Sequence, residues 1–194
     1  FTLPFLLANV LQSLYGAVDL FVVGQYCDAQ SVAAVSTGTQ VTQIVTSLVT
    51  GLTLGGTILI GKYTGMERWD KVKTAIGTTL SIFALVALAL TALTYFATGD
   101  ILRLVNTPAE IFDDAYTYIF IIFMGSGATI LYNLGSGVLR ALGDSRTPLL
   151  FLIAAVIINV GLDILFMAGF GMGVEGAAYA TVISQAASGI ACLV

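Results

Sequence analysis

The sequence contains no histidine and very little charge, and each absence narrows the range of functions. Without histidine there is no His-based acid–base catalysis, no Ser-His or Cys-His nucleophile pair and no histidine metal site. Only 9% of the 194 residues are charged and 58% are hydrophobic, whereas about 25% of an average soluble domain is charged. So few charges cannot cover a water-soluble protein of this size or form the Lys and Arg clusters that bind nucleic acid. We therefore expect a membrane protein that is neither an enzyme nor a nucleic-acid partner, and that needs no cofactor.

Cysteine is also scarce, since only Cys27 and Cys192 are present. They form neither a disulfide framework nor a CxxC pair, and we interpret them as unpaired small hydrophobic residues. The chain begins at Phe1 without a methionine, and both of its ends lie in apolar stretches. We therefore expect it to be part of a longer protein.

Long apolar runs dominate the chain and are separated by short segments that hold most of the charges. A membrane helix needs about 20 mostly apolar residues, and a β-barrel would need alternating segments of about ten residues instead. The runs are continuously apolar, so they predict an all-α fold in which residues 1–194 form one six-helix transmembrane lobe. The predicted spans are 3–25, 31–61, 74–98, 114–139, 148–170 and 175–194.

The positive charges predict the orientation of these spans. Six of the seven Lys and Arg residues lie in two loops, between spans two and three and between spans four and five. Positive charge accumulates in cytoplasmic loops. The two basic loops agree, so the prediction is a multi-pass protein of the cell (plasma) membrane with its N-terminus in the cytoplasm.

Two carboxylates, Asp19 and Asp163, fall inside predicted spans. An ionised Asp at the bilayer centre costs about 2.5–3.5 kcal/mol on insertion scales, so such residues usually face the protein interior and mark an ion pathway. A buried Asp can bind a proton or be held ionised by a cation. The alternative is that both residues only form hydrogen bonds between helices.

Three further polar residues are predicted to lie at a similar depth in the outer half of the membrane. Asn159 precedes Asp163 by four residues, so both project from one face of the fifth span. Helix rise places Thr181 about 9 Å and Tyr118 about 6 Å below the outer ends of their spans. Carboxylates, an amide oxygen and a hydroxyl would suit a proton or a hard cation. We therefore hypothesise that these side chains come together in the folded protein. For Asn159 and Thr181 a structural role remains open, and for Tyr118 the residues themselves favour an interfacial aromatic anchor.

Several segments carry a family resemblance that extends over essentially the whole chain. The most specific are GVLRALGDSRTPLLF from Gly137, NVGLDILF at 159–166 and GFGMGVEGAAYATVISQ ending at Gln185. Near the start, Pro4, LQSLY at 11–15 and the residues around Asp19 fit a first helix, and Ala33-Ala34-Val35 fits a second. Together these residues resemble the multidrug and toxic compound extrusion (MATE) family. The resemblance implies one lobe of a twelve-helix transporter, whose second six-helix lobe would complete the substrate cavity.

The resemblance also implies roles for single residues. It assigns Asp19, Asn159, Asp163 and Thr181 to a first-lobe site for H⁺ or Na⁺, adds Tyr118 from the fourth helix, and associates Pro4 with bending of the first helix. The implied activity is secondary antiport, in which organic, often cationic, drugs or metabolites leave in exchange for H⁺ or Na⁺. Its partners would be the lipid bilayer, the small organic substrate and the second lobe.

Two other functions remain open at this stage. One is a related flippase for lipid-linked saccharides, although the predicted spans lack the Lys or Arg that would hold a phosphate. The other is a non-transporting six-helix membrane scaffold or channel, which uncoupled flux, or normal assembly without flux, would favour.

Overall fold

The computed structural model describes residues 2–192, except for the side chains of residues 2–5, 9 and 13–15. This part of the chain consists of helices joined by short turns and contains no β-strand. The helices are α1 (Thr2–Tyr26), α2 (Ala29–Gly65), α3 (Trp69–Leu104), α4 (Phe112–Met124), α5 (Ser126–Ala141), α6 (Arg146–Ile164) and α7 (Val174–Ala191), with a 3-10 turn η1 (Ala109–Ile111) before α4 and a π-helical turn η2 (Leu165–Gly169) after α6.

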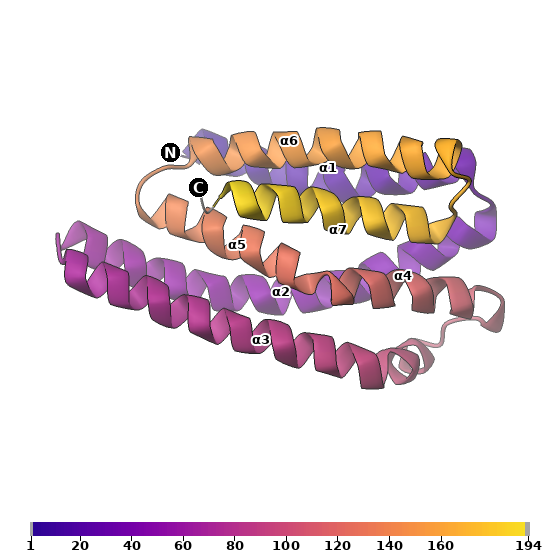
Figure 1. Cartoon of the computed structure of the whole chain (residues 1–194), viewed down its shortest axis with the longest axis horizontal. Coiled ribbons are helices and arrows are strands. Elements are labelled where there is room, and N and C mark those ends of the chain that lie inside the picture. The colour runs from indigo at the N-terminus through magenta and orange to yellow at the C-terminus, as the bar shows by residue number, and fades with distance from the viewer. Residues whose placement is uncertain (1, 193–194) are drawn as a thin grey trace.

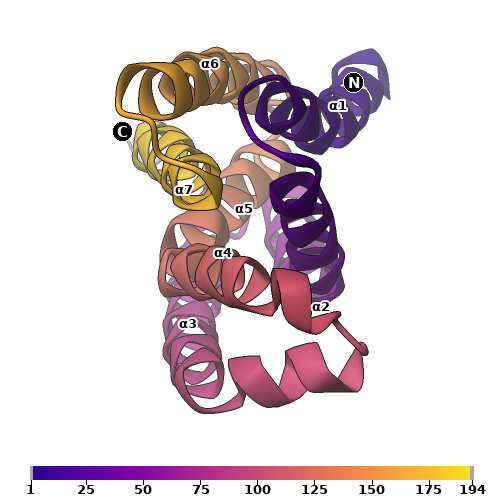
Figure 2. The ribbon, with the colours of Figure 1, turned by 90° about the vertical axis from the view of Figure 1, so that its right-hand side faces the viewer.

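The helices run along one long axis in alternating directions, with α4 and α5 together making one pass (Figure 1). Viewed along this axis, α1 and α6 lie at one side of the bundle and α3 at the other, with α5 and α7 between them (Figure 2). The α2–α3 and α5–α6 turns lie at the same end of the bundle (Figure 1). Six of the seven positive charges belong to these two turns and the adjoining helix ends. The positive charge is therefore concentrated at one end of the bundle, as the sequence predicted.

The second and third helices are longer than the predicted spans. α2 has 37 residues and α3 has 36, which gives lengths of about 54–56 Å against a hydrocarbon core of about 30 Å. The predicted spans end at charged residues such as Lys62 and Lys73, but a helix continues into the polar interface because its hydrogen bonds do not depend on an apolar surrounding.

The fourth predicted span, 114–139, is divided into two helices. α4 and α5 meet at Gly125 with a bend of 48°. A Cβ atom at Gly125 would collide with the side chain of Val182 on α7, so the absence of a side chain at Gly125 allows α7 to pack closely at this point. Bends of this kind occur at Gly/Ser pairs, and Ser126 follows directly.

Four helices of the described chain are long and apolar enough to cross a membrane, or five if the bent pair α4 and α5 counts as one span. The spans that pass alone are 6–26, 29–65, 69–104 and 146–169. The sixth predicted span corresponds to α7, which is not among them. α7 contains Glu175 and Gln185 together with many Ala, Gly and Ser residues, so packing against α4, α5 and α6, rather than apolarity alone, accounts for its place in the bundle.

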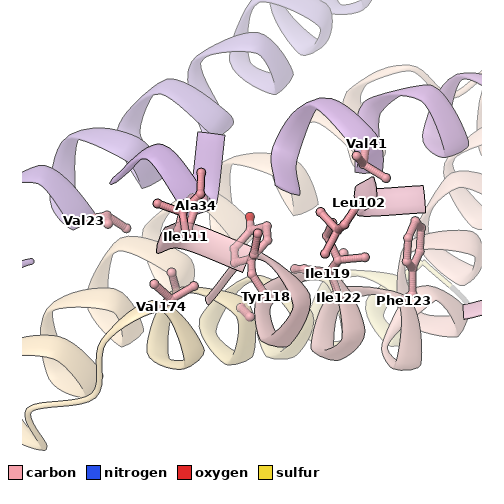
Figure 3. Close-up of a cluster of buried hydrophobic side chains, with 14 of the residues drawn as sticks. Val23, Ala34, Val41, Leu102, Ile111, Tyr118, Ile119, Ile122, Phe123 and Val174 are labelled. Atoms are coloured by element: carbon pink, nitrogen blue, oxygen red, sulfur yellow. The ribbon is translucent and has the colours of Figure 1, made fainter. Parts of the chain in front are cut away.

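The largest hydrophobic core joins α1, α2, α4 and α7 at the end of the bundle opposite the two basic turns. Val23, Val35, Ile119 and Ala177 are fully buried in it. Figure 3 shows Tyr118 within this cluster, between Ile111 and Ile119. The core therefore contains Tyr118 and the α1 residues that flank Asp19, and Tyr118 and Asp19 are two of the polar residues described next.

Candidate ion-binding site

Asp19 lies on α1, seven residues before the end of the helix, and its side chain is only 3% exposed. Its neighbours Val22 and Val23 belong to the hydrophobic core, and α1 packs against α6. Apolar residues on one face of α1 therefore place a carboxylate inside the bundle, where it cannot reach lipid or bulk water.

Asp163 and Asn159 lie on α6 and are 0% and 1% exposed. Their spacing of four residues places them on one face, a turn apart, as the sequence predicted. Asp19 interacts with the side chains of both residues, and the two carboxyl groups are close enough for their charges to interact. Both acids therefore belong to a single cluster between α1 and α6.

Tyr118 reaches this cluster from α4 and is 4% exposed. Its hydroxyl group donates a hydrogen bond to Asp19 Oδ2 over 3.5 Å and lies 3.5 Å from Thr39 Oγ1 on α2. The ring packs directly over Gly38, where a Cβ atom would collide with it. Tyr118 is thus buried inside the bundle, and the interfacial anchor that the sequence favoured for it is wrong.

Thr181 joins the cluster from α7. Its hydroxyl oxygen accepts a hydrogen bond from Asn159 Nδ2 over 3.5 Å, and its carbonyl oxygen accepts one from Ser184. The five polar residues predicted to lie at one level in the membrane are therefore brought together from four helices. Pro4, the candidate for helix bending, lies in the part of α1 whose side chains are outside the described residues.

Several oxygen atoms of the cluster have no hydrogen-bond partner among the described residues. These buried atoms are Oδ1 of Asp19, both carboxylate oxygens of Asp163 and Oδ1 of Asn159. Unpaired buried acceptors are costly. Within the described chain, no group of three or more Cys, Asp or Glu side chains could hold a metal ion, so the oxygen set here consists of two carboxylates, one amide and hydroxyl groups.

Sequence reasoning did not identify Thr39 or Gly38. Threonine recurs along α2, at positions such as Thr42, Thr46 and Thr50, and most of these hydroxyls bond to their own helix backbone. No feature of the sequence therefore distinguishes Thr39 from its neighbours. Its role follows from the position of the Tyr118 hydroxyl, which depends on how α4 packs against α2.

Long apolar helices around buried ionisable side chains define a multi-pass membrane protein. A sequence model of the family named MatE matches residues 4–165, and the chain belongs to this family. The family resemblance proposed from sequence is confirmed, as is the all-α membrane fold.

Curated relatives agree with this assignment. The chain is 36% identical to the "Probable multidrug resistance protein YoeA" of Bacillus subtilis over 198 residues, which cover 100% of this chain and 43% of the relative. It is 30% identical to the "Probable multidrug resistance protein NorM" of Thermotoga maritima, over 94% of this chain and 40% of the relative. The chain therefore spans less than half the length of these relatives.

Solved structures share the fold. A crystal structure described as MATE in the bent conformation superimposes with a TM-score of 0.92 at 25% identity, over 98% of this chain and 42% of the other. The outward-facing conformation of a multidrug resistance MATE family transporter of the MOP superfamily gives a TM-score of 0.86 at 25% identity, over 96% and 41% of the two chains. The described helices thus have the arrangement found in part of a MATE transporter.

Proposed function

We propose that this lobe is the cation-coupling half of a secondary antiporter that exports organic, often cationic, compounds in exchange for H⁺ or Na⁺. A proton or Na⁺ binds at Asp19 and Asp163, with Asn159 and Thr181 as further oxygen ligands. The bound ion offsets part of the negative charge of the two acids and lowers the cost of holding them in a closed lobe. The ion thereby shifts the equilibrium between two transporter conformations.

The observation that carries the proposal is the pair of carboxyl groups buried together between α1 and α6 with unpartnered oxygen atoms. Two acids in one buried site repel each other when both are ionised, and a bound cation or proton relieves this repulsion. Hard cations bind carboxylate and carbonyl oxygens. The donor set therefore fits a proton or a hard cation, and no cofactor is needed for the proposed coupling.

A polar face of α2 supports a substrate cavity beside this site. Gln40, Gln43, Ser47 and Thr50 are exposed and recur at helical spacing along one face. Polar residues within a membrane span favour a water-filled cavity or another helix over lipid. In the proposed transporter this face lines the space between the two lobes, and the second six-helix lobe forms its other wall.

The proposed orientation places the basic α2–α3 and α5–α6 turns in the cytoplasm, since six of the seven positive charges lie there. The N-terminus is then cytoplasmic and the plasma membrane is the proposed location. Asp19 and Asp163 lie nearer the opposite end of their helices, so the coupling ion enters from outside.

The decisive experiment uses the complete reading frame that contains these 194 residues, purified and reconstituted into vesicles. Efflux of a fluorescent organic cation is measured under an imposed H⁺ or Na⁺ gradient. Asp163→Asn should abolish gradient-dependent efflux without changing membrane insertion, and the exposed Asp113→Asn serves as the matched control. Unchanged efflux in Asp163→Asn would refute the coupling role, and gradient-independent flux of the unmodified protein would indicate a channel.

A further inference from the structure

A groove lies between α2 and α3, on the side of the bundle away from the ion site. Its volume is about 510 Å³, and the two helices that form it run side by side from the α2–α3 turn (Figures 1 and 2). Gly55 and Gly56 of α2 help to line it, and a Cβ atom at Gly55 would meet nothing within 4 Å. The absence of a side chain at Gly55 leaves the space open, whereas Gly56 allows α2 to pack closely against Thr79 of α3.

The inner part of the groove is apolar. Leu52, Leu59, Ile82 and Phe83 contribute hydrocarbon side chains to its wall. Three threonines also line it, and their hydroxyl groups donate to the backbone of their own helix: Thr74 to Asp70, Thr78 to Thr74 and Thr79 to Ala75. These donors are already used, so the wall offers little to a polar ligand and suits a hydrocarbon chain.

The end of the groove near the α2–α3 turn is different. Among the described residues that line the groove, Lys71 is the charged one, and its ammonium group lies 5.4 Å from the centre of the Tyr63 ring. Such a cation–π contact holds the ammonium group at a defined place. Lys62, Arg68 and Lys73 add positive charge around the same turn, which also holds Glu67 and Asp70. The basic residues outnumber the acidic ones, so this end is electrostatically complementary to an anion.

The groove also crosses the predicted boundary of the hydrocarbon core. The apolar spans end at residue 61 on α2 and begin at residue 74 on α3, so Tyr63 and Lys71 lie at headgroup level. Trp69, which is 56% exposed, marks the same level, because Trp concentrates at the membrane interface. From Thr74 to Phe83 the helix rises about 14 Å, which approaches the depth of one leaflet, about half of the 30 Å core.

We propose that this groove binds an anionic phospholipid, with the headgroup phosphate at Lys71 and one acyl chain lying along Gly55 between α2 and α3. Basic pockets between membrane helices recognise anionic headgroups in this way. The inference is independent of the proposed antiport, because it rests on a different surface and its test requires no transport.

The test measures lipid retained by the complete polypeptide that contains this chain, using native mass spectrometry with phosphatidylglycerol or phosphatidylcholine added to the detergent solution. Phosphatidylglycerol should bind in preference, and Lys71→Gln should reduce this preference about fivefold. Lys73→Gln is the matched control, since Lys73 lies in the same helical turn but does not line the groove; its preference should remain close to that of the unmodified protein.

A second pair of variants tests the acyl-chain position. Gly55→Leu fills the groove and should remove the bound phosphatidylglycerol, whereas Gly51→Leu, at an exposed glycine one turn away with nothing within 4 Å of its Cβ position, should not. Equal losses in Lys71→Gln and Lys73→Gln would assign the preference to diffuse surface charge and overturn the proposal. Full retention in Gly55→Leu, or displacement of the lipid by millimolar inorganic phosphate, would also overturn it.

Discussion

Asp19 of α1 and Asp163 of α6 lie 144 positions apart in the sequence, yet their carboxyl groups interact within one buried cluster. Two acids at this proximity share one electrostatic environment, so a change at either one affects the other. They also retain unpartnered oxygen atoms. Under the proposed function, such a site sacrifices stability for the capacity to bind a cation, and this trade-off can be tested.

Asp19→Asn is expected to raise the melting temperature of the purified protein at neutral pH. The amide removes a charge that is costly to hold away from water and can still accept the hydrogen bond from Tyr118. Thermal unfolding in detergent measures the effect, and the exposed Asp113→Asn should leave the melting temperature unchanged. A lower melting temperature in Asp19→Asn would mean that the carboxylate is a structural hydrogen-bonding group, which is the alternative left open by the sequence.

Gly38→Ala is expected to destabilise the protein by about 1–3 kcal/mol, the usual cost of overpacking. The added methyl group would collide with the Tyr118 ring and move the hydroxyl group away from Asp19. Gly51→Ala is the matched control, because its Cβ position is open and alanine favours a helix over glycine by about 0.5–1 kcal/mol. Chemical unfolding of both variants provides the comparison, and equal stabilities would contradict the packing described here.

Asn159→Leu is expected to separate Na⁺ binding from proton binding. A proton needs only the carboxylates, whereas Na⁺ needs several oxygen ligands, and Asn159 Oδ1 is a buried oxygen without a hydrogen-bond partner among the described residues. Na⁺ affinity should fall about 10–100-fold, by analogy with the loss of a supporting group at other metal sites. Calorimetric Na⁺ titration measures this, and proton-driven efflux serves as the internal comparison. Loss of both activities would indicate that Asn159 positions the acids instead of binding the ion.

Asp144 stabilises the start of α6 in a pH-dependent manner. Its Oδ1 accepts hydrogen bonds from the backbone amides of Arg146 (2.9 Å) and Thr147 (3.1 Å), and its Oδ2 accepts one from the Thr147 hydroxyl. The bonds from Thr147 hold the pKa of Asp144 below its ordinary value of 3.8. A lowered pKa in the folded state means that the stabilisation is complete above the unfolded pKa and is lost as the pH falls through the folded value.

Asp144→Ala should therefore lower the melting temperature at pH 7, and the difference from the unmodified protein should shrink as the pH falls below about 4. Asp144→Asn is the matched control, since it keeps an acceptor oxygen but cannot titrate. Its melting temperature should lie closer to that of the unmodified protein at pH 7. A difference between Asp144→Ala and the unmodified protein that stays constant from pH 7 to pH 3 would contradict the assignment.

Local sequence was sufficient for some features of the site and insufficient for others. The Asn159–Asp163 spacing fixed their common face, because helical geometry alone relates residues four apart. The family resemblance adds Tyr118 to the ion site, whereas the residues alone favour an interfacial anchor, because depth along a helix does not reveal which way the side chain points. The close contact between Gly125 and Val182 involves another helix and therefore could not be read from the fourth span.

Composition by itself determined that this protein belongs in a bilayer as a helical bundle, because so few charges leave no other stable environment. It also identified Asp19 and Asp163 as candidate functional residues, because burying a carboxylate in lipid is costly whatever the position of its helix in the bundle. Only the tertiary structure decided that α1, α4, α6 and α7 bring their polar side chains to one place. Helix order and rotation depend on contacts such as the ring of Tyr118 against Gly38, which no local pattern encodes.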